Sequence, residues 1–196
     1  VSAMTWAFAP PDPWADPVNV SQGEVTPALP SLTVDSEGRV HALWAEENAT
    51  SGTVLYYARN EGASDAARWT RPARVLTSAG MARQPDFVTV GERLHAVWSG
   101  GTNGSIYYSR AYVRDAYVSG GWETPVPLSG ESATGCWPRI VADLGGALHV
   151  VYAVPLNEGR GLYYTRSDDA GETWTPPQLI LDAAARRWAQ VGHPTL

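Results

Sequence analysis

The chain has 196 residues, 44% of them hydrophobic, and a formal net charge of −6. This length suits one domain or part of a larger protein, and the hydrophobic fraction is sufficient to fill a core. The negative charge argues against a nucleic-acid partner, because phosphate groups need a basic surface. No apolar run approaches the roughly 18 residues of a membrane helix, so we expect no membrane insertion. The single cysteine, Cys136, excludes an internal disulfide and a cysteine-based zinc site.

The first strands predicted along the chain lie within 31–77. Apolar and aromatic residues alternate over short runs that are bounded by Gly, Asp, Pro and Ser. These runs cover 31–35, 39–45, 53–59 and 72–77. The turn Asp35-Ser36-Glu37-Gly38 between the first two is typical of a hairpin. We therefore expect a four-stranded antiparallel unit.

The same unit recurs along the chain with a period of about 54 residues. Each copy has a histidine within a hydrophobic run, then Tyr-Tyr-x-Arg, then Trp-x-x-Pro, in the same order. The recurring residues are His41, His95 and His149, then Arg59, Arg110 and Arg166, then Trp69, Trp122 and Trp174, with an extra Trp-x-x-Pro at Trp14. Four-stranded units at this period are typical of propeller blades. The predicted class is all-β, a β-propeller of four-stranded antiparallel blades.

The repeat divides the chain into successive parts. We expect a leader with an outer strand, three full blade units and the start of another unit, or about three and a half blades. The expected ranges are 1–30, 31–84, 85–137, 138–193 and 194–196.

The stretch SDDAGETW at 167–174 lies between the third and fourth strands of the last full unit. Polar side chains that bond their own backbone, and a glycine that accepts a positive φ, predict a tight turn there. The stretch matches the Asp-box, or bacterial neuraminidase repeat, at Ser167, Asp169, Gly171, Thr173 and Trp174. The chain therefore resembles the sialidase-like β-propellers. In that family the box is a structural element of enzymes and non-enzymes alike.

The resemblance implies a ring of six blades, of which this chain supplies about half. An incomplete ring leaves an edge of unpaired backbone groups. Our hypothesis is that further blades complete the ring, and a second copy of the chain is the alternative. A partner chain that covers the open edge at 191–196 is a third arrangement.

Ligand-binding residues are expected where the repeat breaks, near the starts of the innermost strands. The units align on Pro30, Pro85, Pro138 and Pro194, and the residues just before these prolines differ from one unit to the next. Arginine can bind a carboxylate and tryptophan can stack on a sugar ring. The candidates are Arg83, Trp137, Arg139, Trp188 and His193.

The repeated histidines and arginines are better explained as scaffold. Equivalent positions in neighbouring blades lie about 10 Å apart, whereas zinc needs its ligands at about 2 Å. We expect no metal site and no cofactor, and we expect the arginines to bond between blades or stack on aromatic rings.

Three functions stay open. The favoured one is a non-catalytic extracellular, periplasmic or cell-surface propeller that binds glycan or protein, with turns such as 110–122 as an interaction surface. The second is a sialidase-like glycosidase, in which the resemblance would place Arg83 in a carboxylate clamp, although only Arg83 and Pro85 of the family's Phe/Tyr-Arg-Ile-Pro motif are present. The third is a subunit of a larger assembly. The N-terminal sequence shows no signal peptide.

Overall fold

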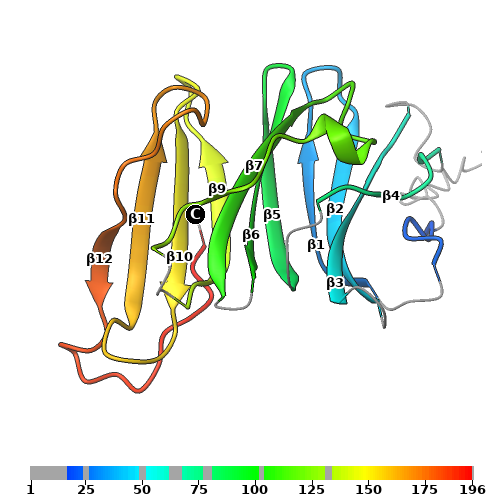
Figure 1. Cartoon of the computed structure of the whole chain (residues 1–196). Coiled ribbons are helices and arrows are strands. Elements are labelled where there is room, and N and C mark those ends of the chain that lie inside the picture. Colours follow the sequence, from blue (N-terminus) through cyan, green and yellow to red (C-terminus); the bar gives the residue numbers. More distant parts are fainter. Residues whose placement is uncertain are drawn as a thin grey trace, which may run out of the picture.

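A computed structural model describes residues 17–23, 27–48, 52–61, 68–76, 81–101, 104–130 and 134–195. Its strands form three four-stranded antiparallel sheets that follow one another along the chain (Figure 1). The first sheet consists of β1 (Pro27–Val34), β2 (Val40–Asn48), β3 (Gly52–Arg59) and β4 (Ala73–Arg74). The second consists of β5 (Ala82–Val90), β6 (Arg93–Gly100), β7 (Ser105–Tyr112) and β8 (Val126–Pro127). The third consists of β9 (Cys136–Ala142), β10 (Leu148–Val154), β11 (Gly161–Ser167) and β12 (Gln178–Asp182).

Each sheet has its strands in chain order, so each is a simple meander. The all-β propeller class predicted from the sequence is confirmed. The fourth strand of the first sheet is shorter than the expected 72–77, and β4 pairs with β3 only through Tyr56 with Arg74 and Tyr57 with Ala73. The described residues contain one short 3-10 turn, Ser119–Gly121, and none of their helical segments has the length and apolarity that crossing a bilayer requires.

The expected outer strand within 1–30 lies largely outside the described residues, and 17–23 form no strand. Residues 17–23 nevertheless contribute to packing, because Val20 contacts the cluster of Ala42, Trp44 and Ala58 on the outer face of the first sheet.

The core lies between successive sheets. Leu43 and Tyr57 of the first sheet pack with Leu94 and Trp98 of the second. On the opposite face of β6, Val97 packs with residues of the third sheet such as Leu148. Because neighbouring side chains of a strand point to opposite faces, one strand can serve two interfaces. This stacking places the beginnings of β1, β5 and β9 next to one another.

Candidate functional site

The three inner strands share a backbone irregularity just before their prolines. Leu29, Gln84 and Trp137 have φ values of 51°, 54° and 50°, and His193 before Pro194 has 51°. The strand register shifts at the same places, between Ala28 and Ser31 in β1 and between Arg83 and Asp86 in β5, and β9 is also irregular there. A bulge of this kind re-aims a side chain that regular pleating would place elsewhere.

The four residues before the prolines all line one pocket of about 300 Å³, which we call the mouth pocket. Its lining consists of Leu29, Pro30, Ser31, Gln84, Pro85, Asp86, Trp137, Arg139 and His193. Positive φ is uncommon for residues other than glycine. A strained backbone conformation recurs at all four aligned positions, and at each of them it turns the side chain toward the mouth pocket.

One wall of the mouth pocket is polar and cross-links the blades. The Gln84 amide oxygen accepts from the Trp137 backbone N–H at 2.9 Å and from the Ser99 hydroxyl at 3.0 Å. The Asp86 carboxylate accepts from the Ser31 hydroxyl at 2.7 Å and from the Ile140 N–H at 3.0 Å. These bonds join β5 to both neighbouring blades, so this wall is held in position before any ligand arrives.

The other wall is aromatic and cationic. The Trp137 and His193 rings stack with centroids 4.2 Å apart and planes inclined by 28°. Arg139 is half-buried, and its guanidinium donates to the Pro138 carbonyl at 3.2 Å, which leaves further donors for a ligand. An aromatic surface beside an arginine and two acceptors suits a polyhydroxylated ring, especially one that carries a carboxylate.

Three of the five predicted candidates, Trp137, Arg139 and His193, therefore meet in one pocket. Arg83 and Trp188 are not among its lining residues. The Arg83 side chain is exposed with Nη2 2.9 Å from the Met81 sulfur, and Trp188 is 45% exposed beside Arg186. Leu29, Gln84 and Asp86 line the pocket although they were not candidates. For Leu29 and Gln84 the signal was available in the alignment on the prolines, where both are the equivalents of Trp137.

The residues that line the mouth pocket offer aromatic stacking, hydrogen bonding and one carboxylate. Hydrolysis of a glycosidic bond ordinarily uses a pair of carboxyl groups, and Asp86 is the one carboxylate among the lining residues. Cys136 precedes Trp137 and is half-buried, and burial raises the pKa of its thiol, so a reactive thiolate is disfavoured. No group of three His, Cys, Asp or Glu side chains that would hold a metal occurs in the described part of the chain.

The Asp-box stretch lies at the other end of its blade, between β11 and β12. The Ser167 hydroxyl donates to Asp169 at 2.8 Å and accepts from the Gly171 N–H, also at 2.8 Å. Asp169 also accepts from the Thr173 N–H at 2.9 Å and from the Thr173 hydroxyl at 2.5 Å, and these bonds lower the pKa of Asp169 to about 2. The side chains of Ser167, Asp169 and Thr173 are thus used within the turn.

The recurring histidines each bond to the second tyrosine of the Tyr-Tyr pair. The distances from His Nδ1 to the hydroxyl are 2.7 Å to Tyr57, 2.7 Å to Tyr108 and 2.8 Å to Tyr164. Because the same histidine–tyrosine bond occurs in all three sheets, we interpret it as a structural element of the blade.

No family model and no curated protein sequence matches the chain. Solved structures do match. The catalytic domain of a family 62 α-L-arabinofuranosidase from Coprinopsis cinerea has 16% identity and a TM-score of 0.56 over 82% of this chain and 53% of its own. A family 117 glycoside hydrolase from Zobellia galactanivorans has 13% identity and a TM-score of 0.55 over 91% and 61%. A Trypanosoma rangeli sialidase has 11% identity and a TM-score of 0.53 over 76% and 29%.

The chain thus spans about half the length of the arabinofuranosidase domain. At these identities the likeness is one of fold. The chain shares the β-propeller fold of glycoside hydrolases and sialidases.

Proposed function

We propose that this chain is a glycan-binding part of an extracellular, periplasmic or cell-surface β-propeller, and that the glycan binds in the mouth pocket. The observation that carries the proposal is the convergence of Trp137, His193 and Arg139 on a pocket whose opposite wall is held by Gln84 and Asp86. Solved structures of the same fold include a galactanase with galactose and a family 62 hydrolase with xylotriose, and these support a sugar ligand.

The proposed role is binding without cleavage by this chain. Both Asp86 oxygens already accept hydrogen bonds from neighbouring blades. A carboxylate whose two oxygens are fixed by hydrogen bonds keeps further lone pairs with which to accept hydrogen bonds from sugar hydroxyls.

A glycoside hydrolase is the second candidate. Its support is the fold shared with arabinofuranosidases and sialidases, together with a carboxylate in the mouth pocket. In that case a second carboxyl group would come from blades outside the described residues.

Binding should be measured by calorimetry with xylotriose, galactotriose and sialyllactose, using the 196-residue chain and its Trp137→Ala variant. We expect Trp137→Ala to weaken binding at least tenfold, about 1.4 kcal/mol. Trp188→Ala is the matched control, because Trp188 is an exposed tryptophan outside the pocket, and it should bind normally. Equal losses in the two variants, or no binding of any of the three sugars, would refute the mouth pocket as the site.

Arg139→Gln separates acidic from neutral ligands. If Arg139 binds a carboxylate, this variant should lose sialyllactose and keep the neutral trisaccharides. Release of products from any of the three sugars, abolished by Asp86→Asn, would instead favour the hydrolase.

A further inference from the structure

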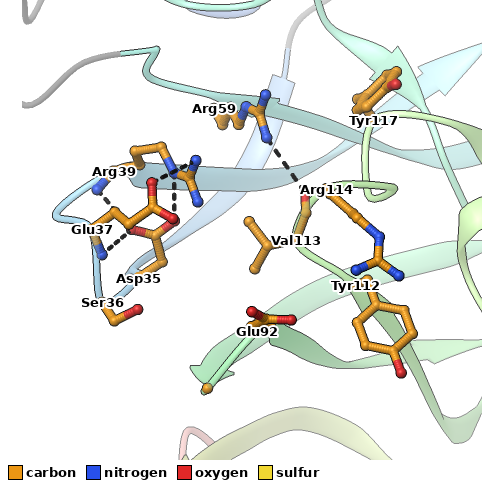
Figure 2. Close-up of a pocket in the computed structure, with 11 residues that line it drawn as sticks. Asp35, Ser36, Glu37, Arg39, Arg59, Glu92, Tyr112, Val113, Arg114 and Tyr117 are labelled. Carbon is orange, nitrogen blue, oxygen red and sulfur yellow. Dashed lines mark hydrogen bonds and ion pairs between the residues drawn. The ribbon is translucent and has the colours of Figure 1, made fainter.

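A second pocket, of about 370 Å³, lies between the first and second blades at the end of β1 and β5 remote from the mouth pocket (Figure 2). We call it the turn pocket. It is formed by the β1–β2 turn, the end of β3, the β5–β6 turn and the segment after β7. Its lining consists of Asp35, Ser36, Glu37, Arg39, Arg59, Gly91, Glu92, Tyr112, Val113, Arg114 and Tyr117.

The equivalent space between the second and third blades is filled by the chain itself. Arg110 points there, and the Asp-box turn of the third blade closes on it. Arg110 Nη1 donates to the Ala170 carbonyl at 2.7 Å and Nη2 donates to the Glu172 carboxylate at 2.6 Å. Nε donates to Glu123 of its own blade at 2.9 Å. The guanidinium is buried, and each of its three nitrogens donates a hydrogen bond.

Arg59 is the equivalent of Arg110 in the first blade, and the turn that faces it has a different sequence. The segment 110–122 lacks the Asp-box pattern and is longer than the box. Among the described residues, the Arg59 guanidinium makes one long hydrogen bond, which Nη1 donates to the Val113 carbonyl at 3.5 Å (Figure 2). Toward the described residues the other donors of the Arg59 guanidinium make no further bond, and these are the donors that we assign to a ligand.

The second-blade turn is held in its open shape by its own bonds. The Asp115 N–H donates to the Tyr112 carbonyl at 2.9 Å, and the Trp122 indole N–H donates to the Ala116 carbonyl at 3.0 Å. Trp122 and Ala116 belong to the core between the first two blades. Because these core contacts hold the turn in position, the turn pocket is formed by the folded chain itself.

The other charges of the turn pocket are mostly paired. Arg39 Nε is 2.7 Å from Asp35 and Nη1 is 3.0 Å from Glu37. Arg114 lies over the Tyr112 ring at 4.5 Å, with Asp115 3.4 Å from its Nε. Glu92 is exposed, and in Figure 2 it lies on the opposite side of Val113 from Arg59 and Tyr117. An incoming anion is therefore attracted to the Arg59 side and repelled from the Glu92 side.

We propose that the turn pocket binds an acidic peptide segment of a partner protein, with a Glu or Asp carboxylate of that segment on Arg59. The equivalent contact already exists within the chain. Arg110 binds the Ala170 carbonyl and the Glu172 carboxylate, which are two residues apart in one turn. A peptide can supply both groups at that spacing, and exposed Tyr117, which lines the same pocket, can contact its side chains. This site is independent of the mouth pocket.

The test uses a fluorescently labelled peptide with the sequence RSDDAGETWT, that of 166–175, and the 196-residue chain. Anisotropy should show binding that falls at least tenfold in Arg59→Gln and also at least tenfold when the peptide glutamate is changed to glutamine. The two changes together should weaken binding no further than either alone, because both remove one contact. Circular dichroism and thermal unfolding establish that Arg59→Gln folds.

Arg166→Gln is the matched control, because Arg166 is the equivalent arginine of the third blade and lies outside the turn pocket. It should bind the peptide normally. Loss of binding in Arg166→Gln with retention in Arg59→Gln would place the peptide on the third blade and overturn the proposal. The absence of peptide binding would also overturn the proposal. A third contrary outcome is that a galacturonate trisaccharide binds instead of the peptide and that Arg59→Gln weakens its binding.

Discussion

Arg110 of the second blade and Glu172 of the third are joined by an ion pair of 2.6 Å, across a separation of 62 residues in the chain. The Arg110 side chain is 7% exposed, so the pair ties a buried cation to the Asp-box turn. Gly171 in the same turn lies against the Tyr108 ring, and Trp174 meets that ring edge-on at 4.9 Å. The Asp-box turn is thus a clamp between blades.

Arg110→Gln should therefore destabilise the chain far more than Glu172→Gln. Loss of the buried guanidinium leaves the Ala170 carbonyl without its donor and leaves Glu123 with Arg93 alone, which together with the lost Glu172 pair we expect to cost about 3 kcal/mol. Glu172 is mostly exposed, and its replacement should cost about 1 kcal/mol. Urea denaturation of the two variants gives both free energies. Equal costs would mean that Glu172, rather than the whole arginine environment, dominates the clamp.

Gly171→Ala tests the glycine of the clamp. Gly171 has φ +86°, and a Cβ atom there would overlap the Tyr108 hydroxyl. Backbone strain and the displaced ring together should cost on the order of 3 kcal/mol. Gly130→Ala is a suitable control, because nothing lies within 4 Å of its added Cβ and its φ is not positive. Thermal unfolding should show a large decrease in Tm for Gly171→Ala and almost none for Gly130→Ala.

Stability should fall in mild acid because of His95. Burial, with Arg110 and Arg93 nearby, lowers the pKa of His95 from 6.5 to about 4. Between these values the unfolded chain binds a proton that the folded chain does not, so stability decreases as the pH falls through 6.5 and the loss is complete below about 4. The expected contribution is on the order of 3 kcal/mol. The free energy of unfolding measured from pH 7 to pH 4 should decline less steeply in His95→Gln, and an unchanged slope would contradict this assignment.

Much of the fold was predictable because the same sequence pattern occurs in three units, and each unit forms the same kind of four-stranded sheet. The histidine-centred strands and the Tyr-Tyr-x-Arg strands are buried along most of their length, and the structure pairs them as expected, for example His41 with Arg59 and His95 with Arg110. The fourth strands were less predictable. They pair on one side only within the blade, so few bonds hold β4 and β8, and apolar pattern alone overstates their length.

The site was predictable only in part. Alignment on the prolines identified Trp137 and His193, because they differ from their equivalents. It did not decide between Arg83 and Gln84, since neighbouring residues of a strand face opposite ways and the bulge determines which one enters the pocket. Asp86 was missed because its partners, Ser31 and Ile140, are more than 50 residues away in the chain. The only sequence feature that pointed to the turn pocket was the longer turn at 110–122, which lacks the Asp-box pattern.

Three residues at the same position of the inner strands provide a last prediction. Phe87 and Ile140 lie two residues after their prolines, and each is 3% exposed because it packs on the preceding blade. Leu32 is their equivalent in β1 and is 64% exposed. In the 196-residue chain, Phe87→Ala and Ile140→Ala should each cost about 3 kcal/mol or more, whereas Leu32→Ala should cost less than about 1 kcal/mol.

The same variants test whether another blade covers Leu32. If further blades or a partner chain pack on the first sheet, the cost of Leu32→Ala should rise toward that of Ile140→Ala when those blades are present, because a buried leucine loses its contacts on truncation. Unfolding of a longer protein or of a reconstituted complex, compared with the 196-residue chain, measures this difference. A small cost in every context would mean that Leu32 faces solvent in the assembled protein, and the first sheet would then be a true edge of the fold.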